Sequence, residues 1–164
     1  MILNPDRLGR YIDPMYRAAW ALCGSRHDAE DLVQETFLNV LKRPRLLREG
    51  NELGYLLRAL RNTYSSGYRT AARRPAARQL FDDDDPAAAF TDESISAREL
   101  MEAIAGVPSP YRDAVIAVDL VGLSYREAAH ALGTREETIT SRLHRGRQHI
   151  ARALTEETTA VAGA

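Results

Sequence analysis

Two helix-start signals on either side of one glycine constrain the fold of this chain most strongly. Ser124 with Glu127, and Thr134 with Glu137, follow the S/T-x-x-E pattern, in which hydroxyl and carboxylate satisfy backbone N–H groups that a helix start leaves unpaired. Gly133 lies between them and can take the left-handed conformation that a sharp turn requires. The spacing therefore predicts two short helices whose starts lie ten residues apart.

The second of these helices carries most of the arginines in the last third of the chain. Ala129 is small enough to let the helices approach, and Ile139 can pack the second helix on the first, so residues 124–152 are typical of a helix-turn-helix that reads DNA. An ordinary helical hairpin is the alternative. With Ile139, Leu143, Gly146 and Ile150 facing inward, the side chains left for phosphates and base edges are Arg135, Glu136, Thr140, Ser141, Arg142, Arg145 and His149.

The composition predicts a globular protein with small helical cores. Aromatic residues make up 7% of the chain, so two small cores of aliphatic side chains fit better than one large core. No segment approaches about 18 consecutive apolar residues, and the N-terminus lacks the pattern of a secretory signal. The single Cys23 excludes an internal disulfide. We therefore expect a cytoplasmic protein without membrane insertion.

The net charge of −1 conceals an uneven distribution. Residues 1–80 carry a net +6, residues 81–104 a net −7, and residues 105–164 no net charge. A basic block and the helix-turn-helix thus flank an acidic strip. Local positive faces set the attraction to phosphates, because exposed charges further apart than about 10 Å are screened. Strong DNA binding by the chain alone is not expected.

Helical periodicity dominates the whole sequence, so the fold class is predicted to be all-α. The clearest amphipathic helix spans residues 28–42, and a longer one spans 52–74, separated by a basic loop. Asp13 and Pro14 suit an N-cap and the first helical position, with a break at Pro14. Ser109 is predicted to cap a helix that stops at Gly122.

This pattern divides the chain into two small helical domains. They cover residues 1–74 and 94–155, are joined by a flexible acidic linker at 75–93, and are followed by a disordered tail at 156–164. The acidic run at 82–85 is either a solvated linker or a mimic of nucleic-acid charge.

With these segments in view, the chain resembles the extracytoplasmic-function sigma factors, the smallest members of the sigma-70 family of bacterial transcription initiation factors. Four segments in order carry the resemblance: DAEDLVQETFLNVLK at 28–42, LLRALRNTYSS at 56–66, VPSPYRDAVIAVDLVGLSYREAAHALG at 107–133, and SRLHRGR at 141–147. It implies an alternative sigma factor whose regions 2 and 4 bind core RNA polymerase and read the −10 and −35 promoter elements. It also implies an anti-sigma partner, which the sequence does not identify.

The resemblance implies three groups of binding residues. Asp31, Gln34 and Glu35 lie off the apolar stripe of their helix, where the family docks on the polymerase clamp. Holding bases out of a duplex requires cations along the backbone and a pocket that stacks on an unstacked base. The residues matched to that −10 role are Arg43, Arg45, Arg48, Asn51, Arg58, Arg61, Asn62, Arg69 and Arg73. Tyr55, Tyr64 and Tyr68 either stack on bases or belong to the core. The −35 role falls on the exposed side chains of the recognition helix given above.

The chain departs from the family pattern at three positions. Tyr55 stands where the family usually has Trp, Ser66 where it usually has Asp, and Thr140 where it usually has Lys or Arg. Loss of a bidentate guanine contact removes about 1–3 kcal/mol of discrimination, so the −35 sequence of relatives does not transfer to this chain.

The sequence contains no pattern for catalysis or for a bound metal. A glycine-rich phosphate loop, a nucleophile elbow and paired catalytic carboxylates are all missing, so we expect neither enzyme activity nor a cofactor. Cys23 and His27 have helical metal-pair spacing, but Cys23 continues an apolar stripe, which disfavours a metal site. The competing functions are a stand-alone helix-turn-helix regulator and a module that binds only proteins.

Overall fold

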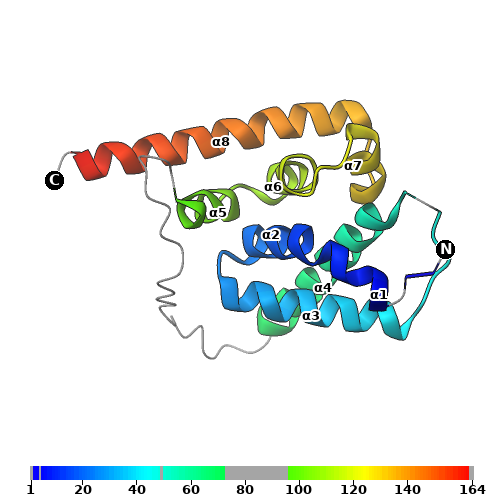
Figure 1. Cartoon of the computed structure of the whole chain (residues 1–164). Helices are drawn as coiled ribbons and strands as arrows, with labels where there is room; N and C mark the ends of the chain where they lie inside the picture. The colour runs from blue at the N-terminus through cyan, green and yellow to red at the C-terminus, as the bar shows by residue number, and fades with distance from the viewer. Residues whose placement is uncertain (1, 4, 49, 73–95, 163–164) are drawn as a thin grey trace.

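The computed structural model describes residues 2–3, 5–48, 50–72 and 96–162 of the 164-residue chain (Figure 1). Within them, the side chains of residues 68–72, 157–158 and 160–162 are not described. The elements are α1 (Pro5–Leu8), the 3-10 helix η1 (Gly9–Tyr11), α2 (Ile12–Cys23), α3 (Arg26–Lys42), α4 (Glu52–Ala72), α5 (Ala97–Ala105), α6 (Ser109–Val115), the π-helix η2 (Ile116–Leu120), α7 (Tyr125–Leu132) and α8 (Glu136–Ala162). The all-α prediction is confirmed.

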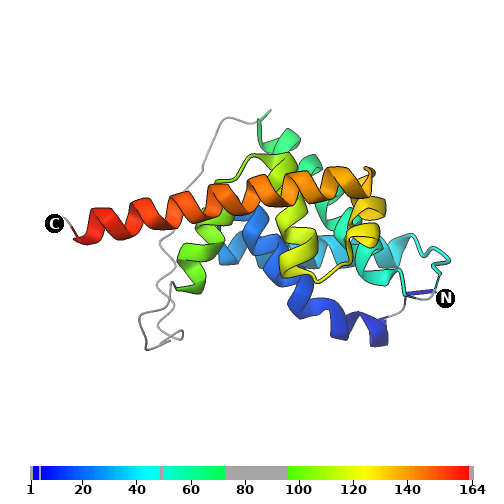
Figure 2. The same ribbon diagram turned by 90° about the horizontal axis from the view of Figure 1, so that it is seen from above.

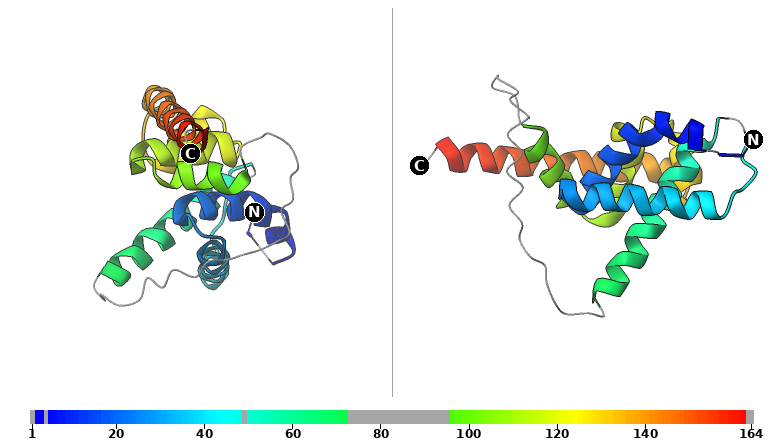
Figure 3. Two further views of the ribbon diagram at one scale, coloured as in Figure 1. Left: turned by 90° about the vertical axis from the view of Figure 1, so that its left-hand side faces the viewer. Right: turned by 60° about the horizontal axis from the view of Figure 1, so that its bottom comes forward.

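Helices α2, α3 and α4 form one layer, and α5 to α8 form a second layer on top of it (Figures 1 and 3). The long helix α8 lies across α5, α6 and α7 on the outer side of this second layer (Figure 2). The C-terminal end of α4 projects away from both layers in the two views of Figure 3.

The N-terminal layer begins with a helix break that lies earlier than predicted. The break is the 3-10 turn Gly9–Tyr11, and α2 starts at Ile12 with Tyr11 as its N-cap. The prediction of Asp13 as N-cap and of a break at Pro14 is therefore wrong. Pro14 fits inside the first turn of α2, because the N–H groups of a first turn have no partner within the helix.

The connection between α2 and α3 follows standard capping chemistry. Gly24 ends α2 with φ +73°, and its N–H donates to Trp20 O at 2.7 Å. Ser25 then caps α3 by accepting the Asp28 N–H at 3.3 Å. Helix α3 covers the predicted amphipathic segment and buries Leu32, among others, toward α2 and α4.

Two of the C-terminal helix starts differ from prediction. The N-cap of α6 is Pro108, not Ser109, and no side-chain cap bond is made there. Helix α8 begins at Glu136, so Arg135 rather than Thr134 takes the N-cap position. The Thr134 N–H donates to Ala129 O at 2.9 Å, and this bond helps to close the C-terminal end of α7.

The other capping predictions hold. Ser124 and Glu127 form a complete capping box at the start of α7, and Gly133 ends α7 with φ +64°. A further capping box, formed by Ser96 and Glu99, starts α5 and was not predicted. The predicted acidic flexible linker at 75–93 lies outside the described residues.

The predicted disordered tail at 156–164 is wrong up to Ala162, because α8 continues to that residue. No Gly or Pro follows Gly146 before position 163. The hydroxyls of Thr155 and Thr159 donate to carbonyls one turn earlier, at 2.7 and 2.9 Å, so both side chains bond within the continuous helix.

Buried apolar side chains of both layers belong to one contiguous cluster, so the expectation of two separate cores is wrong. Helix α2 packs on α5 and η2, and α4 packs on α7. Small residues allow this close approach: a Cβ added to Gly24 would lie 3.4 Å from Ala105 Cβ, and one added to Gly54 would lie 3.7 Å from Ala131 Cβ. Among the described residues, no helix is both long and apolar enough to cross a membrane.

Candidate nucleic-acid interface

The recognition helix is held on α6 by its inward face, as the sequence predicts. Ile139 and Leu143 are almost completely buried. Gly146 lies so close to α6 that an added Cβ would meet Val115 Cγ2 at 2.6 Å and Tyr111 O at 2.9 Å. The opposite face of the first turns of α8 is thereby fixed toward solvent.

Four of the predicted base-reading side chains lie on this solvent face near the start of α8. Arg135, Glu136, Thr140 and Ser141 are all exposed, whereas Arg142 is half-buried. The Thr140 hydroxyl donates to Glu136 O at 3.2 Å, and the Ser141 hydroxyl donates to Thr138 O at 3.1 Å. Both hydroxyls therefore retain only acceptor capacity for a base edge unless they exchange these bonds.

The other two predicted −35 residues are engaged with α6. Arg145 Nη1 donates to the Tyr111 hydroxyl at 3.0 Å, and its guanidinium lies 5.8 Å from the centre of the Tyr111 ring. The His149 ring stacks on the same tyrosine at a centroid distance of 5.9 Å. These contacts orient Arg145 and His149 along the side of α8 that faces α6.

Nearby, Arg147 joins α8 to η2 through a two-bond contact with Asp119. Its Nε and Nη2 donate to the two carboxylate oxygens at 3.0 and 2.7 Å. The hydrogen bonds that Arg147 donates to Asp119 raise the pKa of Arg147 above its usual value. Arg147 thus has a structural role within the C-terminal layer.

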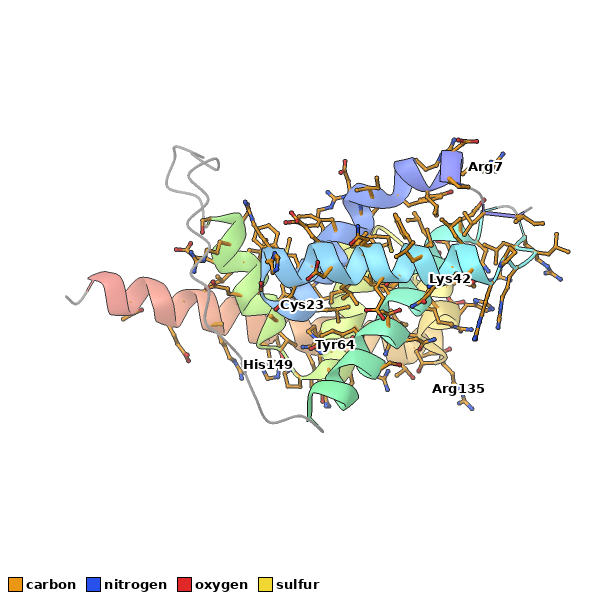
Figure 4. All side chains as sticks on the ribbon, turned by 90° about the horizontal axis from the view of Figure 1, so that it is seen from below. Arg7, Cys23, Lys42, Tyr64, Arg135 and His149 are labelled. Atoms are coloured by element: carbon orange, nitrogen blue, oxygen red, sulfur yellow. The ribbon has the colours of Figure 1, made fainter. Side chains whose placement is uncertain are left out.

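The predicted basic loop connects α3 and α4. Arg43, Arg45 and Arg48 are exposed there, and Asn51 is half-buried. An isolated antiparallel bridge between Ile2 and Leu46 ties the loop to the N-terminus. This loop and the start of α8 lie toward the same end of the molecule (Figures 1 and 2), and Figure 4 shows Lys42 and Arg135 at that end.

Helix α4 carries the remaining predicted −10 residues. Asn62 and Arg58 are exposed and Arg61 is half-buried, and both arginines are bonded to the C-terminal layer. The Arg69 side chain and Arg73 lie outside what the structure describes. The loop cations and Asn62 thus lie at the surface, whereas the guanidinium groups of Arg58 and Arg61 are hydrogen-bonded to the C-terminal layer.

Two of the three predicted stacking tyrosines are described, and both pack against the core. Tyr55 and Tyr64 are half-buried. The guanidinium of Arg112, in α6, lies 5.8 Å from the ring centre of Tyr64, which Figure 4 labels on α4. The side chain of Tyr68 is not described. Base stacking by Tyr55 or Tyr64 would require these contacts to open.

The predicted polymerase-binding residues share one exposed face of α3. Asp31, Gln34 and Glu35 are all exposed, and the His27 imidazole lies 3.8 Å from the Asp31 carboxylate. Leu38 completes this face at helical spacing and is 51% exposed. Leu38 was not among the predicted polymerase-binding residues, although its place off the apolar stripe was the available signal.

Cys23 and His27 show no arrangement for a metal. Burial, with a smaller contribution from Asp28, raises the pKa of the Cys23 thiol to about 12, so the thiol is protonated and unreactive at neutral pH. Within the described residues, no three His, Cys, Asp or Glu side chains form a group that could hold a metal ion.

Comparison with known proteins matches both halves of the chain in order. Residues 8–74 match the family described as "Sigma-70 region 2", and residues 97–150 match "Sigma-70, region 4". The ECF RNA polymerase sigma factor EcfG of Rhodopseudomonas palustris is 33% identical over 150 residues, which covers 86% of this chain and 80% of EcfG. The chain belongs to the extracytoplasmic-function sigma factors.

Other members of this sigma-factor family agree. SigC of Mycobacterium tuberculosis is 32% identical over 157 residues, covering 90% of this chain and 83% of SigC. SigE of Mycolicibacterium smegmatis is 36% identical over 153 residues, covering 88% of this chain but only 59% of SigE. The chain therefore matches little more than half the length of that relative.

Two solved structures share the fold. The sigma factor RpoE of Bartonella quintana, in complex with the anti-sigma factor NepR, has a TM-score of 0.75 at 24% identity, covering 92% of this chain and 95% of RpoE. CnrH, in complex with the cytosolic domain of CnrY, has a TM-score of 0.63 at 20% identity, covering 92% of this chain and 86% of CnrH.

Proposed function

We propose that this chain is an alternative sigma factor that binds core RNA polymerase and directs it to a two-part promoter. The observation that carries the proposal is the ordered match to sigma-70 regions 2 and 4 within one chain. An exposed recognition helix and an exposed basic loop supply the chemistry for two separate DNA contacts. The same match favours this role over a stand-alone regulator, whose N-terminal half would have no reason to resemble region 2.

In this proposal, the two DNA contacts divide between the layers. The basic loop after α3 and the exposed face of α4 bind the −10 element, with Asn62 offering hydrogen bonds to an unstacked base. The first turns of α8 enter the major groove at the −35 element, as the second helix of a helix-turn-helix does. The modest net charge of the C-terminal half suits a reader that depends on polymerase for most of its affinity.

The proposed polymerase contact is the exposed face of α3. The carboxylates of Asp31 and Glu35 provide negative charge for a positively charged partner surface. Leu38 provides an apolar centre that would lose its contact with water on binding. The charge-reversed variant Glu35→Lys should weaken core binding, whereas Asp6→Asn, at an exposed carboxylate of α1, should not. Equal binding by both variants to labelled core polymerase would contradict this assignment.

The remaining parts of the proposal follow from the family. The protein would act in the cytoplasm, where polymerase meets promoter DNA, and would contribute no chemical step of its own. An anti-sigma factor is a proposed partner, because RpoE and CnrH were solved with NepR and with the CnrY cytosolic domain.

Reconstituted transcription tests the function directly. Bacterial core polymerase, fragmented genomic DNA from the bacterium that encodes the chain, and the purified protein should yield discrete transcript starts that are missing without the protein. Asn62→Ala and Arg135→Ala should reduce these transcripts, because both side chains are exposed on the proposed DNA surfaces. They are better test variants than Arg61→Ala or Arg145→Ala, whose side chains also hold the fold together.

The matched control is Arg152→Ala, an exposed arginine further along α8 that lies outside the proposed DNA face. It should leave the transcripts unchanged. Tight promoter binding by the protein alone, together with no binding to core polymerase, would instead support a stand-alone regulator. Binding to neither would favour a module that binds only proteins.

A further inference from the structure

A cavity of about 460 Å³ lies among helices α2, α4 and α6. Helices α2 and α4 belong to the N-terminal layer and α6 to the C-terminal layer, so both layers line it (Figure 1). Packed protein interiors contain few voids larger than a water molecule, whose share of liquid volume is about 30 Å³. Small-molecule sites occupy about 300–1,000 Å³. The cavity therefore has the size of a ligand site rather than of a packing defect.

The residues that line the cavity range from deeply buried to exposed. Leu22 is 3% exposed and Asp113 is 9% exposed, whereas Ser65 of α4 and Ser109 of α6 are exposed. A ligand can thus enter past two hydroxyl groups and reach charged side chains held between the helices. A hydroxyl group can donate a hydrogen bond to an anion as well as accept one.

Two arginines and one carboxylate line the cavity, and the carboxylate is paired with only one of the arginines. Nε and Nη2 of Arg61 both donate to Asp113 Oδ2, the Nε bond at 3.0 Å. Among the described residues, no ion pair joins Arg112 to a carboxylate. The charge of Asp113 is therefore compensated by Arg61, and the positive charge of Arg112 is in excess.

The guanidinium of Arg112 is held in place without being fully satisfied. Its Nη1 donates to Ala105 O at 3.2 Å, and the group lies 5.8 Å from the centre of the Tyr64 ring. Its Nε is buried without a hydrogen-bond partner. Burial of a cation is costly unless the cation is paired and hydrogen-bonded. An anion in the cavity would supply both a countercharge and acceptor oxygens, which a cationic or neutral ligand would not.

Among small anions, a phosphoryl group fits this set of donors best. It carries a charge of about −1.5 to −2 at pH 7 and three strong acceptor oxygens. The planar fork of a guanidinium matches two of these oxygens, and the hydroxyl of Ser109 or Ser65 can donate to the third. A carboxylate has only two oxygens and a single charge, so it would satisfy fewer of these donors.

We propose that this cavity binds a phosphoryl group, either as free phosphate or as the phosphate end of a small metabolite, with Arg112 as its main binding residue. Ser109 and Ser65 donate hydrogen bonds to it from the exposed side of the cavity. The site is separate from the proposed polymerase-binding face of α3 and from the basic loop, because neither lines the cavity. The proposal concerns the free protein and does not depend on the proposed function.

Isothermal titration calorimetry of the full chain with potassium phosphate tests the site, with potassium chloride at equal ionic strength as the blank. Phosphate should bind saturably and should raise Tm in a concentration-dependent way, because a ligand that binds only the folded state stabilises it. A parallel titration with glucose 6-phosphate, with glucose as its blank, identifies the source of the phosphoryl group. Tighter binding than that of phosphate indicates a phosphorylated metabolite, and weaker or equal binding indicates free phosphate.

Three variants at the cavity leave Arg61 unchanged, so they do not alter the predicted −10 residues. Arg112→Gln should weaken phosphate binding about tenfold or more, as expected from loss of a hydrogen bond between charged groups, and Arg112→Lys should restore part of the affinity. Ser109→Ala should weaken binding about threefold, the effect of one neutral hydrogen bond. The Ser109 side chain is exposed and makes no capping bond, so this variant keeps the test valid if Arg112→Gln does not fold.

The matched control is Arg126→Gln, at an exposed arginine of α7 that does not line the cavity, and it should bind phosphate like the wild type. The site is overturned by phosphate heats no larger than those of the chloride blank, or by equal affinity in the wild type, Arg112→Gln and Ser109→Ala. An equal loss in Arg126→Gln also overturns it, because phosphate would then bind a basic surface in general. Binding of the same samples to core polymerase is an independent measurement: phosphate binding without polymerase binding keeps the site and removes the sigma-factor role, and the reverse result removes only the site.

Discussion

At the scale of single residues, Gly146 sets the distance between the recognition helix and α6. Gly→Ala normally stabilises a helix by up to about 1 kcal/mol. In Gly146→Ala, however, the new methyl group would lie 2.6 Å from Val115 Cγ2 and 2.9 Å from Tyr111 O. We expect a net destabilisation of about 1–3 kcal/mol, the usual effect of overpacking, measured by urea unfolding. Gly67→Ala in α4 is the control, because nothing lies within 4 Å of its added Cβ. Equal stability of both variants would show that the α6–α8 contact is looser than the structure shows.

The capping box at the start of α7 gives a pH-dependent prediction. Hydrogen bonds from the Ser124 hydroxyl and then from its backbone N–H lower the pKa of Glu127. A carboxylate with a lowered pKa in the folded state contributes stability above its unfolded pKa of about 4.3, and this contribution disappears as the pH falls through the lower folded pKa. Glu127→Gln should therefore lower Tm at pH 7, and the difference from the wild type should shrink at about pH 3. Thermal unfolding followed by circular dichroism measures both, and a constant difference would contradict the bond.

At the scale of helices, α8 combines a packed half with a projecting half. Ile139, Leu143 and Gly146 are buried on α6 and α7, whereas Ala151, Arg152, Thr155 and Glu156 are exposed. Helices without tertiary packing open locally at little cost in free energy. Native-state hydrogen exchange should show slow exchange for amides of residues 139–150 and fast exchange for residues 156–162. Uniform protection along α8 would mean that something packs on its C-terminal turns.

The helices that the sequence predicted well are those with a strong local signal. The amphipathic stripe of α3, the Ser124 box and the turn at Gly133 depend on residues within one or two turns of each other. The errors arose where several local signals compete: Ser109 and Thr134 looked like caps, but Pro108 and Arg135 hold those positions. The C-terminal turns of α8 were predicted as disordered because chain ends often fray, yet α8 continues to Ala162.

At the scale of the whole molecule, the sequence predicted the exposure of the proposed site residues better than their contacts with the rest of the chain. The exposure of the basic loop and of the start of α8 follows from their local composition. The pairing of Arg61 with Asp113 joins residues 52 positions apart, and no periodicity or spacing predicts such a contact. The single core was missed for the same reason, because the close approaches of Gly24 to Ala105 and of Gly54 to Ala131 join residues far apart in the sequence.

The shared core leads to a prediction about unfolding. Apolar side chains of α2 and α4 are covered by α5, η2 and α7, so separation of the layers exposes part of each core to water. We expect calorimetry of the intact chain to show one transition, with equal calorimetric and van't Hoff enthalpies, as for a single cooperative unit. Asp113→Asn weakens the coupling between layers and should broaden or split this transition, whereas Asp119→Asn should shift it without splitting. Two transitions in the wild-type protein would mean that each layer is stable without the other.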